Sequence, residues 1–105
     1  MEFTKSEKKQ LRELAEEVYE SEASGLLKEL DEQFSRWRQG EILSSELLRE
    51  IHYFHQHQSR ELWSMYQSLP EALVVERGVA HGLLAESKVP APLLAKLNIG
   101  AIKEK

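Results

Sequence analysis

The sequence lacks cysteine and has little proline, little glycine and no long uninterrupted apolar run. Without cysteine, the 105-residue chain can form no disulfide, thiolate nucleophile or cysteine-ligated metal site. The longest apolar run, Ala72 to Val75, is far shorter than the ~20 residues that a membrane helix needs. No apolar secretory segment follows Lys5, Lys8 and Lys9. We therefore expect a soluble cytoplasmic protein that does not span a membrane.

An excess of basic residues is also absent. The chain has 14 Lys and Arg residues against 18 Asp and Glu residues, which gives a formal net charge of −4. Because phosphate neutralisation needs clustered basic side chains, and here they are scattered, we expect no nucleic-acid partner. A hydrophobic fraction of 41% is adequate for one folded core, so residues 1–105 are predicted to form a single helical domain.

The first predicted helix runs from Thr4 to Arg38. Thr4 and Glu7 have the spacing of a capping box, and Gly40 provides the stop. Ser21, Ser24 and Gly25 could interrupt this helix, but the apolar phase continues through them, so we expect one continuous helix. Its apolar side follows steps of three and four: Leu11, Leu14, Val18 or Tyr19, Ala23, Leu26 or Leu27, Leu30, Phe34 and Trp37.

A second helix is predicted after a short loop, with Ser44 or Ser45 as its N-cap. Its end is ambiguous. The register can continue to Leu69 as one helix, or Ser59 can begin a new helix; we favour a kink or short break between His57 and Ser59. The residues expected on the buried side are Leu47, Leu48, Ile51, Phe54 and His55.

Shorter helices are predicted in the last third of the chain. Pro70 is suited to the first position of one helix, with Ser68 and Glu71 at capping-box spacing around it. Gly78 inside this helix indicates the close approach of another helix, and Gly82 ends it. A last short helix can begin at Pro92 and end at Leu97, and residues 98–105 are expected to be a partly disordered tail.

These predictions define an all-α fold. It is a long antiparallel helical hairpin, residues 4–40 against residues 44–69, closed by one or two shorter C-terminal helices. The first helix would be roughly 50 Å long, whereas a domain of this size is ~30 Å across. Because its projecting part includes Leu11, Leu14 and Val18, we predict a homodimer or larger homo-oligomer that covers the excess.

Three histidines, His52, His55 and His57, suggest a transition-metal site for Zn, Ni or Fe. On a helix, His52 and His55 are about 60° apart and can share an ion, but His57 is about 140° from His52. A third ligand would come from a break after Gln56, from His81 or from another chain. The alternative is that His55 is a core or interface histidine and the other two are solvated.

Two further groups of residues are candidate binding surfaces. Glu13, Glu16, Glu17 and Glu20 form an acidic run that could dock a basic partner or could simply be a solvated face. The aromatic residues Tyr19, Trp37, Trp63 and Tyr66 recur at helical spacing and are predicted anchors of the core or of a subunit interface.

The leading functional prediction is a non-enzymatic protein–protein interaction or regulatory module with no bound cofactor. The acidic run or the aromatic residues would form its binding surface. The alternative is a metal-binding protein, such as a metal-dependent hydrolase, centred on His52, His55 and His57.

Overall fold

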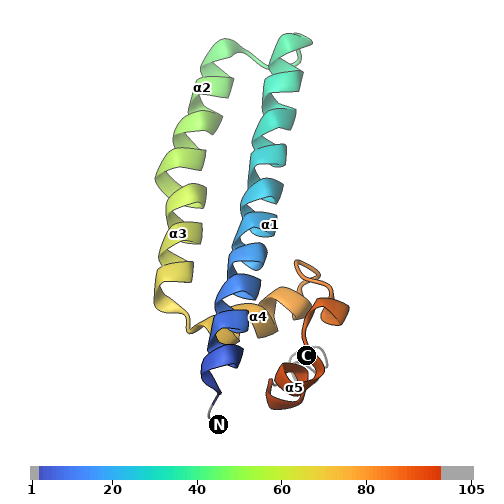
Figure 1. Ribbon diagram of the computed structural model, residues 1–105. Coiled ribbons are helices and arrows are strands. Elements are labelled where there is room, and N and C mark those ends of the chain that lie inside the picture. Colours follow the sequence, from blue (N-terminus) through green and yellow to red (C-terminus); the bar gives the residue numbers. More distant parts are fainter. Residues whose placement is uncertain (1–2, 98–105) are drawn as a thin grey trace. The chain divides into compact units, whose positions relative to one another are not determined.

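The computed structural model describes residues 3–97. Within this range all regular elements are helical and there is no strand, so the all-α prediction is confirmed (Figure 1). The predicted disordered tail, residues 98–105, lies outside the described residues. The elements are α1 (Lys5–Arg38), α2 (Ser44–Tyr53), the π-helix η1 (Phe54–Gln58), α3 (Ser59–Ser68), α4 (Glu71–Ala80), the 3-10 helix η2 (Glu86–Lys88) and α5 (Ala91–Lys96).

The chain divides into two compact units. Unit 1 comprises Met1–Ser21 with Leu69–Lys105, and unit 2 comprises Glu22–Ser68. The 34-residue helix α1 contributes its first half to unit 1 and its second half to unit 2. Because one uninterrupted helix belongs to both units, the single domain expected from the sequence stays a prediction.

The predicted caps of α1 are present at both ends. The Thr4 backbone N–H donates to Glu7 Oε1 at 2.8 Å, and the Glu7 N–H donates to Thr4 Oγ1 at 3.1 Å, which completes a capping box. At the other end Gly40 has a φ of 78°, and Glu41 N–H bonds the Arg36 carbonyl at 2.8 Å. This six-to-one bond over a left-handed glycine is a Schellman motif. Between its two caps α1 is one helix, Lys5–Arg38, so its predicted continuity is confirmed.

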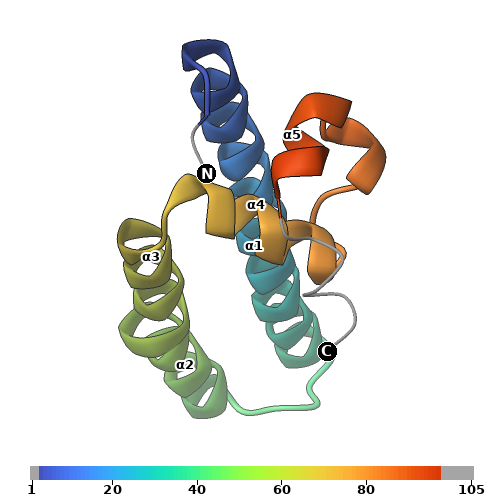
Figure 2. The same ribbon diagram turned by 90° about the horizontal axis from the view of Figure 1, so that it is seen from below.

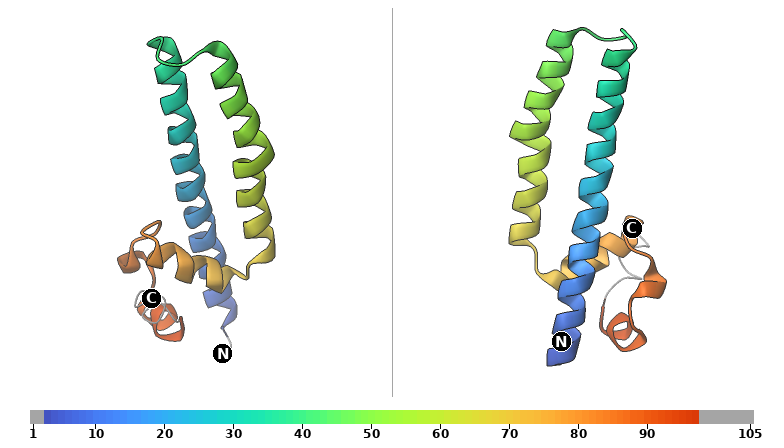
Figure 3. Two further views of the ribbon diagram at one scale, coloured as in Figure 1. Left: turned by 180° about the vertical axis from the view of Figure 1, so that it is seen from behind. Right: turned by 45° about the horizontal axis from the view of Figure 1, so that its top comes forward.

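Unit 2 is an antiparallel helical hairpin. Residues 22–38 of α1 lie beside α2, η1 and α3, which run in the opposite direction (Figures 1 and 3). The N-cap of α2 is Leu43, so the prediction of Ser44 or Ser45 was wrong. Glu46 Oε1 accepts the Leu43 N–H at 3.1 Å and takes over half of the capping role. The Ser44 hydroxyl instead accepts the Trp37 indole N–H at 3.0 Å.

The second arm of the hairpin is irregular where a kink or short break was predicted, because η1 interrupts the α-helix and α3 begins at Ser59. A π turn occupies that place: Ser59 has helical dihedral angles, and its N–H donates to the carbonyl of Phe54, five residues earlier. Figure 2 shows α2 and α3 following each other as one helix through this turn.

The apolar spacing explains the π turn. Phe54, Gln58, Leu62 and Tyr66 are all buried or half-buried, and three successive steps of four separate them. Each step of four advances about 40° around an α-helix, so three steps would turn Tyr66 about 120° away from the side of Phe54. A π turn contains one extra residue, which reduces this accumulated rotation by about 100°. All four side chains therefore stay on the same side of the arm.

Unit 1 is built where α4 crosses the first half of α1 (Figures 1 and 3). Gly78 permits this crossing, as predicted: a Cβ at this position would lie within 2.9 Å of Val18 Cγ1 and closer still to Val18 Cγ2. Gly82, with a φ of 74°, ends the helix in a second Schellman motif, because Leu83 N–H bonds the Gly78 carbonyl. The predicted close helix approach is therefore confirmed.

The start of α4 differs in detail from the prediction. Pro70 is its N-cap, and the first helical residue is Glu71. The Ser68 hydroxyl donates to the Met65 carbonyl at 3.0 Å, so it closes the end of α3 and does not cap α4. A serine near a helix junction can serve either neighbour, and the sequence spacing alone does not distinguish the two roles.

The first half of α1 is covered within the chain. Leu11, Leu14 and Val18 have exposed fractions of 3%, 7% and 0%. The prediction that these residues project and are covered by a second subunit was wrong, because unit 1 already buries them. Homo-oligomerisation itself stays a prediction, and any support for it has to come from other residues.

Candidate functional site

The buried apolar side chains are distributed unevenly between the two units. Of the twelve buried hydrophobic residues in the described part of the chain, ten lie in unit 1, and only Leu47 and Leu62 lie in unit 2. The exposed large hydrophobic residues show the opposite distribution, with six of seven in unit 2. Those six are Leu27, Trp37, Leu43, Leu48, Tyr53 and Trp63. The hairpin is therefore the part of the described chain with unburied apolar surface.

Three of these residues lie on one side of the hairpin. Leu48 and Trp63 each follow a buried leucine, and Leu27 follows the half-buried Leu26. The two arms are antiparallel, so a two-fold axis perpendicular to the plane that contains them exchanges one arm with the other. In both arms, therefore, the residue directly after an inward-facing residue projects on the same side of that plane. We call Leu27, Leu48 and Trp63 the LLW face; their exposed fractions are 55%, 66% and 60%.

Sequence reasoning placed one residue of this face wrongly and left another ambiguous. Leu48 was expected on the buried side together with Leu47, and the choice between Leu26 and Leu27 was left open. Successive side chains of an α-helix point about 100° apart, so only one leucine of each adjacent pair can face the other arm. The adjacent leucines at 26–27 and 47–48 were thus the available signal of an apolar side on the hairpin.

The three candidate histidines do not form a site within one chain. His52, His55 and His57 are all exposed, so the expected burial of His55 was wrong. The His57 ring lies against the Tyr53 ring, with centroids 4.9 Å apart and planes at 34°. In residues 3–97 no group of three His, Cys, Asp or Glu side chains is arranged to hold a metal ion. The Zn, Ni or Fe site stays a prediction.

The acidic run is an exposed stripe of unit 1. Glu13, Glu16, Glu17 and Glu20 are all exposed, and Lys88 Nζ forms an ion pair with Glu17 Oε1 at 3.0 Å. The two side chains are 49% exposed for Glu17 and 58% for Lys88, so water screens the pair and its contribution to stability is small. The acidic run contains no basic residue of its own, and Lys88 from η2 provides one positive charge beside it.

The predicted aromatic anchors separate into different roles. Tyr66 donates its hydroxyl to Glu22 Oε1 at 2.7 Å, and Trp37 bonds Ser44, so both tie the two arms of the hairpin together. Tyr19 is half-buried in unit 1. Trp63 is the most exposed of the four, and for this reason it is the strongest interface candidate among them.

A partly buried ion pair links α5 to α1 inside unit 1. Lys96 Nζ donates to Glu7 Oε1 at 2.6 Å, and the Glu7 side chain is only 11% exposed. The hydrogen bond from Lys96, together with the backbone N–H of Thr4, holds the pKa of the Glu7 carboxyl below its usual range. This carboxylate is engaged in structure and is poorly placed to exchange a proton with a substrate.

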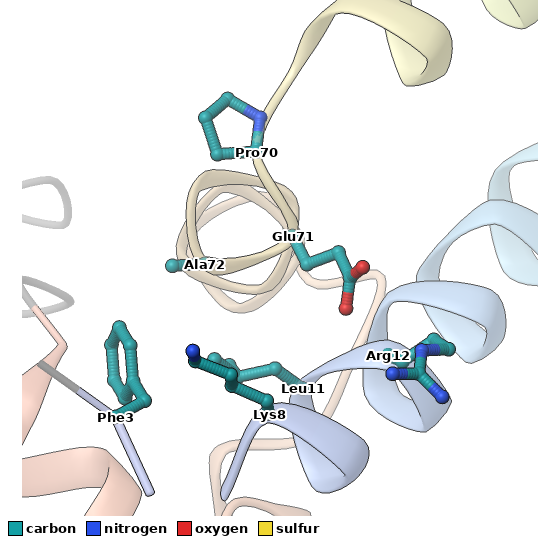
Figure 4. Close-up of a pocket in the computed structure, with 7 residues that line it drawn as sticks. All are labelled: Phe3, Lys8, Leu11, Arg12, Pro70, Glu71 and Ala72. Carbon is teal, nitrogen blue, oxygen red and sulfur yellow. The ribbon is translucent and has the colours of Figure 1, made fainter. Parts of the chain in front are cut away.

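Unit 1 also has an open pocket of about 320 Å³, shown in Figure 4. Phe3, Leu11 and Ala72 contribute apolar side chains to it, and in Figure 4 Lys8 lies beside Leu11. Its lining residues are Phe3, Lys8, Leu11, Arg12, Pro70, Glu71 and Ala72. These lining residues include no nucleophile paired with a base, which is the arrangement that nucleophilic catalysis requires.

No family model, curated protein or solved structure matches the chain. Within residues 3–97, no helix combines the length and the apolar character that crossing a membrane requires.

Proposed function

We propose that this chain is a non-enzymatic protein–protein interaction module of the cytoplasm and that the helical hairpin of unit 2 is its binding surface. One observation carries the proposal: unit 2 buries two large apolar residues and exposes six. Several exposed leucine, tyrosine and tryptophan side chains on one hairpin are typical of surfaces that a protein partner covers. The acidic run is the competing surface, and it would suit a basic partner.

Photo-crosslinking in the cells that make the protein tests this proposal. Benzoylphenylalanine would replace Trp63 in one variant, Glu16 in a second and Glu71 in a third, all of them exposed positions. We expect discrete protein adducts from position 63 and none from position 71, because only the hairpin position touches a partner. Adducts from position 16 alone would show that the acidic run, and not the hairpin, is the binding surface. An absence of adducts from positions 16 and 63 would contradict the interaction module itself.

A further inference from the structure

The LLW face of unit 2 needs a cover that the hairpin does not supply. Two helices in contact bury one side of each other and leave both flanks in water, whereas four helices enclose a continuous core. In unit 2 the inward side holds Leu47 and Leu62, while Leu27, Leu48 and Trp63 remain outside. We infer that a second copy of this chain packs against the LLW face and completes a four-helix bundle. The inference rests on the proposed function and names the partner.

The size of this side of the hairpin suits a dimer. Residues 22–38 of α1 span about 25 Å, and two adjacent helices are about 20 Å wide. A side of these dimensions covers about 500 Å² per chain, so two copies together would bury about 1,000 Å², which is the lower end of the range for specific protein–protein interfaces. The three large apolar side chains on it supply the desolvated anchors that such an interface needs at its centre.

The polar residues around the LLW face suit a second copy. Asp31 follows Leu27 by four residues on α1, and His52 follows Leu48 by four residues on α2; both are exposed. Residues four apart lie on the same side of a helix. The Asp31 carboxylate therefore lies beside Leu27 on α1, and the His52 imidazole lies beside Leu48 on α2. A two-fold axis that places α1 of one copy against α2 of the other sets these two groups opposite each other. The face is therefore complementary to itself.

Light scattering on the full chain measures the outcome directly. At tens of micromolar we expect a mass of twice the 12.2 kDa of one chain. Leu48→Lys and Leu27→Lys should each weaken self-association at least about tenfold, because each replaces an apolar side chain of the interface by a charge. Both residues are exposed, so lysine leaves the helix intact, and circular dichroism checks this.

Tyr53→Lys is the matched control. Tyr53 is 51% exposed, but it precedes the half-buried Phe54 and therefore projects from the other side of the hairpin. This variant should remain dimeric. A doubled mass that Tyr53→Lys abolishes, and that Leu27→Lys and Leu48→Lys leave unchanged, would overturn the assignment of the face.

Trp63 provides a second readout that does not depend on a disruptive substitution. In a Trp37→Phe background it is the only tryptophan, since the chain has two. Its emission should shift to shorter wavelength as concentration rises, in parallel with the mass, because the indole leaves water on association. A doubled mass with unchanged emission would show that the copies meet elsewhere and would overturn the inference.

Failure of the inference can be distinguished from failure of the proposed function. A mass of one chain at all concentrations, with crosslinked adducts at position 63 that contain a different protein, would overturn the second copy and leave the interaction module standing. A mass of one chain with no adduct at positions 16 and 63 would overturn both.

Discussion

Two glycines inside helices have opposite surroundings. At Gly78 a Cβ would lie within 2.9 Å of Val18 Cγ1, whereas at Gly25 it would meet nothing within 4 Å. We expect Gly78→Ala to lower the free energy of unfolding by about 1 to 3 kcal/mol, because the crossing of α4 over α1 must widen. Gly25→Ala should raise it by up to about 1 kcal/mol through helix propensity. Urea denaturation of both variants measures the difference, and equal stabilisation by both would show that the close crossing is not maintained.

The carboxylate of Glu7 links stability to acidity. Its pKa is lowered first by the Lys96 hydrogen bond and then by the Thr4 N–H, so the unfolded chain binds this proton more readily than the folded chain does. The stabilisation is therefore complete above the pKa that this carboxyl has in the unfolded chain, and it is lost as the pH falls through the lower pKa of the folded chain. Thermal melts from neutral to acid pH should show this loss.

Glu7→Gln is the control for this pH dependence. The amide cannot ionise but keeps an oxygen for Lys96 and for the Thr4 N–H, which Glu7 holds at 2.6 and 2.8 Å. We expect this variant to be less stable than the wild type at neutral pH and to lose less stability on acidification. If the two pH profiles differ only by a constant, then the proton that governs acid unfolding belongs to another group.

At the scale of elements, the π turn η1 is an insertion that the helix accommodates. We expect deletion of Gln56, an exposed residue of this turn, to convert it into ordinary α-helix and to keep Leu62 and Tyr66 in their present phase. The melting temperature should stay the same or rise, and the amide signals of the flanking helices should persist.

Deletion of Ser64 is the matched comparison. Ser64 is also exposed, but it lies in α3 between Leu62 and Tyr66. Its loss therefore rotates one of these two residues about 100° away from the side of the arm that faces α1. We expect a loss of at least about 1 kcal/mol, since either the burial of Leu62 or the Tyr66–Glu22 hydrogen bond fails. Similar melting temperatures for the two deletions would contradict this account of the π turn.

Local signals in the sequence were sufficient for both ends of α1 and for the end of α4, and they were insufficient for the other element ends and for what covers each helix. Thr4 with Glu7, Gly40 and Gly78 were interpreted correctly, because capping and close approach depend on one or two residue types. The π turn was missed because period counting assumes a constant advance per residue. The burial of Leu11 was attributed to the wrong partner, because apolar periodicity identifies a buried side and not the segment that covers it.

At the scale of the whole chain, stability should be uneven along α1. Its first half carries Leu11, Leu14 and Val18 in the core of unit 1, whereas its second half has no fully buried apolar residue and depends on the hairpin. Amide exchange follows local opening, which is rare where apolar contacts are dense and frequent where they are few. A single continuous helix can thus be strongly protected at one end and weakly protected at the other.

Hydrogen exchange on the Leu48→Lys variant at low concentration tests this gradient. We expect amides of residues 22–38, α2 and α3 to exchange faster than those of residues 11–18 and α4, because ten of the twelve buried apolar residues of the described chain lie in unit 1. In the wild type, protection of the hairpin should rise with concentration while protection of unit 1 stays constant, since association stabilises only the surface that it covers. Equal protection of the two halves of α1 in this variant would mean that the hairpin is stable alone and that its exposed leucines and tryptophan need no partner for folding.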